Sequence, residues 1–339
     1  MRIGIAVGGV DAEVIDFVRE AERLGAESVW VPEAWGHDAL TPLGALAATT
    51  GRIALASGVV QLGTRTPAML AMSALSLQHL SGGRFRLGVG VSGPQVMEGW
   101  HGVRFDRPVQ RTRETIEILR LVTAGERLVY DGEIHRLPLP GGEGRALRVA
   151  APPAPVPVYV AALGPRNLRL TGELADGWLG NSFLCPTAHV FLDEIRAGAE
   201  AAGRDPAEID ITVGVSCEIT DEVEAAGRRH AAGFAFTFGA MGSSRSNFYN
   251  AALTRQGYGD VVAEVERLWR AGDRDAARRA VPVELGLGMN LIGPPAEIRR
   301  RLVEYRDAGV DMLRVTPVGE TLDDRLAVLG HLLDIARTV

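Results

Sequence analysis

One continuous stretch, residues 55–94, constrains the fold more than any other part of the chain. An apolar run, Ile53 to Val60, is followed by an amphipathic segment that begins at Pro67 and by a second apolar run, Phe85 to Val91. This pattern predicts a strand, a helix and another strand. Parallel strands need a crossover of this kind, and helices normally cover both faces of the sheet that they form. The stretch therefore predicts a βαβ unit in a buried parallel sheet.

Strand-like and helix-like segments alternate along the rest of the chain, which indicates an α/β protein with a TIM (β/α)8 barrel. A doubly wound open sheet is the alternative, but no GxGxxG loop follows the first strand, which counts against a dinucleotide fold. We expect a single domain, residues 1–339, with a mostly helical insertion at about 221–289 before the last strand. The expected strands are Arg2–Val7, Ser28–Val31, Ile53–Val60, Phe85–Val91, Val158–Ala162, Gly177–Gly180, Ile209–Ile219 and Met312–Val315.

Composition excludes several classes of function. All 36 basic residues are arginine, so Schiff-base chemistry and a lysine-dependent phosphate loop are excluded. The net charge of −6 argues against nucleic acid as a partner. No window approaches the roughly 20 apolar residues of a transmembrane helix, so we expect no membrane partner. The seven histidines are scattered without ligand spacing, which predicts no metal site.

Cysteine content and the N-terminus bear on location. The two cysteines, Cys185 and Cys217, do not suggest a disulfide framework. The N-terminus enters a strand at once and lacks a signal-peptide pattern. Both observations predict a cytoplasmic protein.

Acid–base candidates lie at the carboxyl ends of two expected strands, where barrel enzymes carry their chemistry. Glu33 and His37 follow the second strand, and Glu98 and His101 follow the fourth. The apolar neighbours of Glu98 suit a general acid. The alternatives are that Glu98 faces solvent, that His37 is a solvated loop histidine and that His101 lines a pocket without acting as a catalyst.

Five motifs are spread along most of the chain: SVWVPEAW at 28–35, the stretch 55–94, YVAALGP at 159–165, ADGW at 175–178 and LIGP at 291–294. They resemble the bacterial luciferase-like monooxygenase family, and more narrowly its branch that uses the deazaflavin coenzyme F420. The resemblance implies an oxidoreductase that moves a hydride between C5 of the deazaflavin and a small organic substrate. The alternatives are an FMN-dependent monooxygenase that uses O₂ and a non-catalytic F420- or flavin-binding protein.

The resemblance also implies how the coenzyme is bound. Gly58-Val59 matches a non-proline cis peptide that presses a side chain against the ring. Residues 161–166 match the phosphate-binding loop, where backbone N–H groups at a helix start form an anion site. Arg65 either binds the acidic tail of the coenzyme or braces the barrel rim. The full implied set is Glu33, Gly58, Val59, Gln61, Arg65, Ser92, Ala161, Ala162, Leu163, Gly164, Arg166, Gly180, Asn181 and Ser182.

Substrate-side roles are implied in the same way. The family often has an acidic residue at the Glu98 position, as a proton donor or a substrate-orienting group, and Trp35 is expected to wall the substrate pocket. F420-dependent sugar-phosphate dehydrogenases place a histidine directly after the acidic residue that corresponds to Glu33. Ala34 stands there in this chain, which argues against alcohol oxidation by that mechanism.

Aromatic residues are dense in residues 233–249, although the whole chain is only 6% aromatic. Glycines interrupt this segment, as in an active-site lid over an apolar substrate. A buried helical cap or a subunit contact would have the same composition. The resemblance further implies a homodimer or a higher homo-oligomer.

Overall fold

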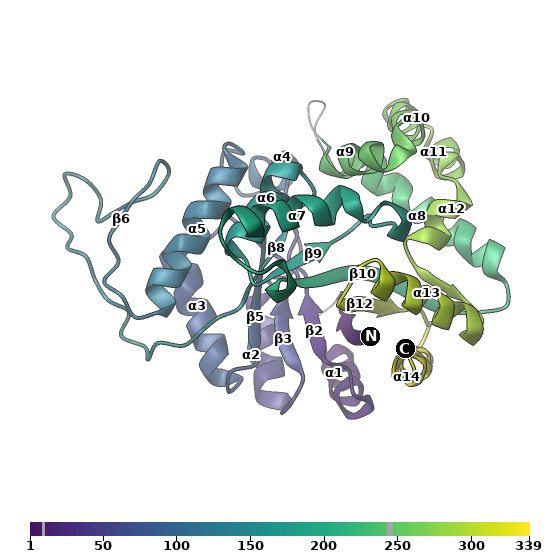
Figure 1. Ribbon diagram of the computed structural model, residues 1–339, viewed down its shortest axis with the longest axis horizontal. Coiled ribbons are helices and arrows are strands. Elements are labelled where there is room, and N and C mark those ends of the chain that lie inside the picture. The colour runs from purple at the N-terminus through teal and green to yellow at the C-terminus, as the bar shows by residue number, and fades with distance from the viewer. Residues whose placement is uncertain (9–10, 243–246) are drawn as a thin grey trace.

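The computed structural model describes residues 1–8, 11–242 and 247–339. Its strands form a closed parallel barrel, in which β12 pairs with β1 and β9 pairs with β10 (Figure 1). The TIM barrel predicted from the sequence is confirmed. The barrel strands are, in spatial order, β1 (Arg2–Ala6), β2 (Ser28–Val31), β3 (Ala54–Ser57), β5 (Phe85–Gly90), β8 (Val158–Ala161), β9 (Gly177–Gly180), β10 (Asp210–Ile219) and β12 (Met312–Pro317).

Two short strands extend this barrel. β4 (Val60–Gln61) follows β3 after a break at Gly58 and pairs with β5, so the third strand continues toward the carboxyl-end rim. β11 (Leu291–Gly293) pairs with the end of β10.

Helices surround the barrel, and their ends follow local sequence signals. Asp11 begins α1 by accepting a hydrogen bond from the Val14 N–H at 2.9 Å, and Gly25, at φ 105°, ends it. Thr66 and Pro67 begin α3 in the same manner. The outer helices are α1 (Ala12–Leu24), α2 (Leu40–Thr49), α3 (Pro67–Leu80), α5 (Pro108–Thr123), α6 (Pro165–Leu174), α7 (His189–Ala201), α13 (Pro295–Asp307) and α14 (Leu322–Ala336).

The main hydrophobic core lies between the strands and the outer helices, as the apolar character of both strand faces predicts. A smaller cluster fills the barrel interior. Trp30 is its largest member, and its indole N–H donates to Ser28 Oγ at 2.9 Å. The other members are Ala56, Tyr159, Leu179 and Met312. These side chains fill the barrel interior below the carboxyl-end rim. A ligand must therefore bind above them, at the rim.

The insertion before the last barrel strand is helical, as predicted, and has a hydrophobic cluster of its own. Leu184, from the segment after β9, belongs to this cluster and joins the insertion to the barrel. The insertion comprises α8 (Val223–Ala240), α9 (Phe248–Leu253), η3 (Thr254–Tyr258), α10 (Gly259–Arg270), α11 (Arg274–Ala280) and α12 (Val283–Gly288).

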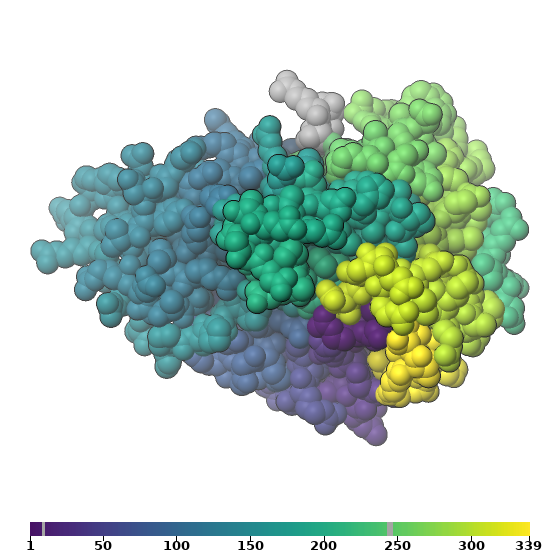
Figure 2. All heavy atoms as spheres, in the orientation of Figure 1, coloured from purple at the N-terminus to yellow at the C-terminus, as the bar shows by residue number. Residues whose placement is uncertain are grey.

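A hairpin formed by β6 (Tyr130–Asp131) and β7 (Arg136–Leu137) lies at the end of the molecule opposite α10 and α11 (Figures 1 and 2). Glu114 of α5 is buried and holds its turn, because its carboxylate accepts hydrogen bonds from the backbone N–H groups of Glu133, Ile134 and His135. Within the described ranges, no helix combines the length and the apolar character that a membrane crossing requires.

Candidate active site

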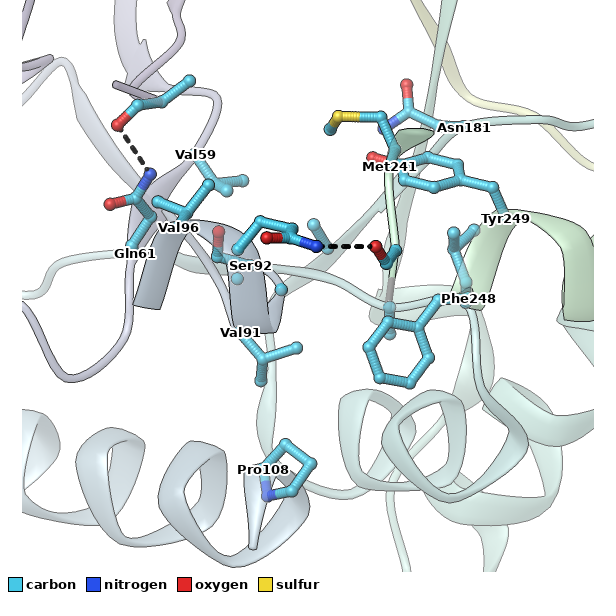
Figure 3. Close-up of a pocket in the computed structure, with 18 of the residues that line it drawn as sticks. Val59, Gln61, Val91, Ser92, Val96, Pro108, Asn181, Met241, Phe248 and Tyr249 are labelled. Atoms are coloured by element: carbon cyan, nitrogen blue, oxygen red, sulfur yellow. Dashed lines mark hydrogen bonds between the residues drawn. The ribbon is translucent and has the colours of Figure 1, made fainter. Parts of the chain in front are cut away.

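A cavity of about 870 Å³ opens at the carboxyl ends of the barrel strands. One wall comes from β4, β5 and the short helix α4 (Pro94–Met97), and the facing wall comes from α8, α9 and their junction (Figure 3). A hydrogen bond bridges the two walls, because Gln95 Nε2 donates to the Gly242 carbonyl at 3.3 Å. Most of the lining is apolar, with a few polar groups, as in sites for small molecules and cofactors.

The peptide bond between Gly58 and Val59 is cis, and both residues line the cavity. Val59 packs over Gly90, where an added Cβ would lie 2.8 Å from Val59 Cγ2. A Cβ on Gly58 would lie 3.0 Å from Arg314 Nη1 and 3.2 Å from Trp30 Cβ. Gly58 and Gly90 thus pack closely against neighbouring protein atoms, and neither projects a side chain into the cavity that both line.

The start of α6 lies at one end of the cavity. Ala161, Ala162, Leu163, Gly164 and Arg166 all line it, as the sequence predicts. No side chain caps this helix, so its first N–H groups remain available to a ligand. The buried Asn167 side chain lies here too, and its Oδ1 has no hydrogen-bond partner among the described residues. These groups fit the phosphate and polar tail of a cofactor.

A polar cluster supports the rim at β2 and β4. The Gln61 side chain donates to the backbone carbonyls of Glu33 and Ala34 at 3.2 and 3.0 Å. Its Oε1 lies 3.0 Å from His101 Nε2. Arg65 forms an ion pair with Glu33 at 2.8 Å. Gln61 and Glu33 line the cavity, whereas His101 and Arg65 stand behind them.

Of the four acid–base candidates, the structure places only Glu33 on the cavity wall. Glu98 is exposed, and its Oε1 accepts a hydrogen bond from the Phe105 N–H at 3.0 Å, so it closes a loop. His37 is exposed on the loop after β2. His101 is held by Gln61 and is separated from the cavity by it. These three side chains therefore do not line the cavity, and their catalytic roles stay a prediction.

Most of the implied cofactor set does meet in the cavity, including Ser92 and Asn181. Arg65, Gly180 and Ser182 do not line it. An added Cβ on Gly180 would point at the Trp178 ring, 2.5 Å away, which directs that position into the protein. The Ser182 carbonyl accepts a hydrogen bond from Gln256 Nε2 at 2.7 Å, which binds the segment after β9 to the insertion.

The predicted lid segment lies partly outside the described residues, since 243–246 are not among them. Phe236, Ala240 and Met241 of the first half, and Phe248 and Tyr249 of the second, line the cavity. Trp35 also lines it, as expected. Trp100 and Arg314 are lining residues that sequence reasoning did not select. The available signal for Arg314 was a charge within an otherwise apolar strand, M312-L-R-V-T316.

Arg314 lies at the floor of the cavity, only 9% exposed. Its Nη2 donates to Asn181 Oδ1 at 3.1 Å, and its Nη1 lies 3.5 Å from the Gly58 carbonyl oxygen. Burial lowers the pKa of Arg314 to about 10, an effect that Tyr249 partly offsets. The guanidinium still carries its charge at neutral pH.

A parallel barrel with an apolar cavity at its carboxyl-end rim, an uncapped helix start after its fifth strand and a helical cover defines a cofactor-dependent TIM-barrel enzyme. The sequence matches the luciferase-like monooxygenase family over residues 6–312, and the chain belongs to that family. The resemblance identified from the motifs is thereby confirmed.

Individual relatives are similar over nearly the whole chain. A putative coenzyme F420-dependent oxidoreductase of Mycobacterium tuberculosis is 39% identical, covering 93% of this chain and 95% of its own length. The 5,10-methylenetetrahydromethanopterin reductase of Methanolobus tindarius is 30% identical, with 94% of each chain covered. The solved coenzyme F420-dependent tetrahydromethanopterin reductase of Methanopyrus kandleri superposes with a TM-score of 0.80 at 23% identity, covering 97% of each chain.

Proposed function

We propose that this protein is a coenzyme F420-dependent oxidoreductase acting on a small organic substrate. The observation that carries the proposal is that Gly58, Val59 and the uncapped start of α6 line one cavity at the carboxyl-end rim. The two curated relatives described above, a putative F420-dependent oxidoreductase and a methylenetetrahydromethanopterin reductase, support this chemistry. A protein of this kind positions two reactants and excludes water, while the coenzyme supplies the hydride transfer when bound.

The cavity residues divide into two groups toward this coenzyme. Gly58, Val59 and Gly90 would receive the flat ring, because all three line one wall and the two glycines project no side chain into the cavity. The start of α6 would hold the acidic tail through its uncapped N–H groups and the Arg166 charge, and the unpartnered Asn167 Oδ1 would accept a hydrogen bond from a hydroxyl of that tail. Gln61, Ser92 and Glu33 complete the polar lining.

Substrate would occupy the apolar space under α8 and α9, against Phe248 and Val96. In a reductase the acceptor is an activated C=C or C=N bond, which needs a proton from the protein. Tyr249 lines the cavity, and burial raises its pKa even though the charge of Arg314 lowers it in part. Its hydroxyl therefore stays protonated at neutral pH and can supply that proton. Glu33 is the other titratable candidate on the wall.

Fluorescence titration of the purified protein with F420, and separately with FMN, tests the proposal. Tight binding of F420 with weak binding of FMN is expected, followed by loss of the reduced-coenzyme signal without oxygen when an acceptor is supplied. A preference for FMN together with oxygen consumption would make the protein an FMN-dependent monooxygenase. Tight F420 binding without turnover across enone and imine acceptors would make it a coenzyme-binding protein instead.

We also propose that the protein forms homodimers through α2 and α3. The outward side of these helices contains no aspartate, glutamate or arginine, and Met69, Met72 and Leu80 are 52%, 52% and 66% exposed on it. An uncharged apolar face of this kind is typical of a protein interface. Size-exclusion chromatography with light scattering would detect the dimer.

A cytoplasmic location also remains a proposal. Cys185 and Cys217 are free thiols, which fits a reducing compartment. Burial raises the pKa of Cys185 to about 11 and that of Cys217 to about 12, so both stay protonated and unreactive at neutral pH.

A further inference from the structure

The Arg314 guanidinium is a buried cation without a carboxylate partner among the described residues. Its neighbours are an amide oxygen from Asn181, a backbone carbonyl from Gly58 and the ring of Trp30, whose centroid is 6.0 Å from the guanidinium carbon. None of these groups carries a negative charge. Burying a charge without a counter-charge is unfavourable, so the arrangement by itself disfavours the folded protein.

Two glycines make space for this side chain. An added Cβ on Gly214 of β10 would lie 2.8 Å from Arg314 Nη2, and one on Gly58 would lie 3.0 Å from Nη1. Residues from strands on opposite sides of β12 in the barrel therefore leave room for the guanidinium at the cavity floor. Its position is built by the fold and does not result from a flexible surface side chain.

The neighbouring amide is oriented to donate. Because Asn181 Oδ1 accepts from Arg314 Nη2, its amide nitrogen points elsewhere, and no hydrogen bond from that nitrogen occurs among the described residues. Asn181 and Tyr249 both line the cavity (Figure 3). A guanidinium, an amide N–H and a phenol O–H together form a set of donors that suits an anionic oxygen.

The charge balance of the cavity points the same way. Three charged side chains line it, namely Glu33, Arg166 and Arg314. Glu33 is neutralised by Arg65, and neither of the two lining arginines forms an ion pair with any described residue. A chain with a net charge of −6 thus presents an electropositive cavity, one arginine at the mouth and one at the floor. Local charge of one sign in a low-dielectric cleft attracts a ligand of the opposite sign.

We propose that Arg314 and Asn181 form an oxyanion site at the floor of the cavity, which binds an anionic oxygen of the bound reactants. The oxygen belongs either to a carboxylate of the substrate or to the coenzyme ring, and both sources require the same donors. This proposal deepens the proposed function. It rests on that function only where the anionic oxygen belongs to the coenzyme ring. The apolar walls above the site favour an amphipathic substrate with its anionic group directed to the floor.

The first arm of the test uses the protein without coenzyme. Thermal unfolding is followed with hexanoate and, in parallel, with the neutral hexanamide. Hexanoate should raise the midpoint of the wild-type protein more than hexanamide does, and Arg314→Met should weaken hexanoate binding at least about tenfold while leaving hexanamide unchanged. Arg314→Lys should retain part of the effect, because lysine keeps the positive charge but lacks the planar guanidinium that can bind both oxygens of a carboxylate.

The second arm measures F420 affinity by fluorescence in the same variants. A loss of about tenfold or more in Arg314→Met, with hexanoate binding unchanged, would assign the oxygen to the coenzyme. If neither ligand distinguishes Arg314→Met from the wild type, or if hexanoate and hexanamide lose affinity equally, the oxyanion site is wrong. The first arm contains no F420. Its result can therefore be interpreted even if the protein does not bind that coenzyme.

Asn181→Asp keeps the test decisive if Arg314→Met does not fold. The new carboxylate has nearly the same shape as the amide and would pair with the guanidinium 3.1 Å away. This variant should unfold at a higher temperature than the wild type, because it compensates the buried charge. It should also lose hexanoate binding, because an internal anion fills the site. A stabilised variant that still binds both hexanoate and F420 as the wild type does would overturn the proposal.

Discussion

Both terminal nitrogens of Arg65 bond to the carboxylate of Glu33, with Nη1–Oε1 and Nη2–Oε2 distances of 2.8 Å. The Ala39 N–H donates to the same carboxylate at 3.1 Å, which connects the pair to the start of α2. Glu33 therefore lies on the cavity wall with its charge neutralised from behind. The pair fixes the rim without adding negative charge to a cavity that must accept an acidic coenzyme tail.

Replacing Arg65 with methionine should leave the Glu33 carboxylate without its counter-charge. We expect a loss of about 2 kcal/mol in the free energy of unfolding, since a partly buried charge is left unpaired. F420 should also bind more weakly, because the cavity loses part of its positive charge. Denaturant unfolding and fluorescence titration measure both effects. Arg23→Met, which removes a similar pair with Glu20 on the surface, is the control and should cost less than about 1 kcal/mol.

Replacing Gly58 with leucine should weaken F420 binding sharply. The new Cβ would meet Arg314 Nη1 at 3.0 Å and Trp30 Cβ at 3.2 Å, so the larger side chain would displace these groups and distort the cavity wall that Gly58 lines. A decrease in affinity of about tenfold or more is expected by titration. Gly330→Leu on α14, where nothing lies within 4 Å of an added Cβ, should bind F420 as the wild type does. Unchanged affinity in Gly58→Leu would remove the ring-contact assignment.

The barrel could be predicted from the sequence because its signals are local. Apolar runs, Pro67 at a helix start and Gly25 at a helix end each act within a few residues of the chain, and alternating strands and helices leave few topologies. The family resemblance added the cis bond at Gly58 and the α6 loop, which propensity alone does not reveal.

The missed parts of the site depend on contacts between residues distant in the chain. Arg314 and Gly58 are 256 residues apart, and Arg314 and Asn181 are 133 apart, so no local pattern predicts their meeting. The same cause explains the misplaced acid–base candidates. His101 follows the correct strand, but Gln61, 40 residues earlier, occupies the position between it and the cavity.

Tyr249→Phe should lower the rate of hydride transfer while leaving F420 affinity nearly unchanged. The phenol supplies the proton in our assignment, and loss of a general acid typically reduces turnover about 100-fold or more. Single-turnover oxidation of reduced F420 by the best acceptor from the enone and imine screen measures the step. The ring of phenylalanine keeps the packing against the cavity, so a structural effect should be small. An unaltered rate would direct attention to Glu33.

Met72→Glu should convert the proposed dimer to a monomer. The change places a charge at the centre of the uncharged α2–α3 face, and a charge buried in an interface without a partner disfavours association. Light scattering after size-exclusion chromatography reports the mass. Leu147→Glu makes the same kind of change at a residue that is 76% exposed away from that face, and it should leave the mass of the assembly unchanged. A dimer that persists in Met72→Glu would place the interface elsewhere.

Glu114→Gln should destabilise the hairpin that projects from α5. The Glu114 carboxylate accepts hydrogen bonds from four residues, one through a side chain and three through backbone N–H groups. In Glu114→Gln, an amide NH₂ group would replace one carboxylate oxygen and could face the N–H of His135, whose nitrogen lies 2.7 Å from Oε2. A loss of about 2 kcal/mol in the free energy of unfolding is expected, with Glu143→Gln on the exposed connector as the control.

The cost of Glu114→Gln should also depend on pH. Burial raises the pKa of Glu114, but the hydrogen bonds from Gln110 and from the backbone of residues 133–135 outweigh burial and hold the pKa below its ordinary value of 4.5. A carboxylate with a lowered folded pKa contributes stability that is fully present above the unfolded pKa and is lost as the pH falls through the folded one. The difference in unfolding free energy between the wild type and Glu114→Gln should therefore be constant at neutral pH and shrink below pH 4.5. A difference that grows on acidification would show that the carboxylate does not hold the hairpin in its ionised form.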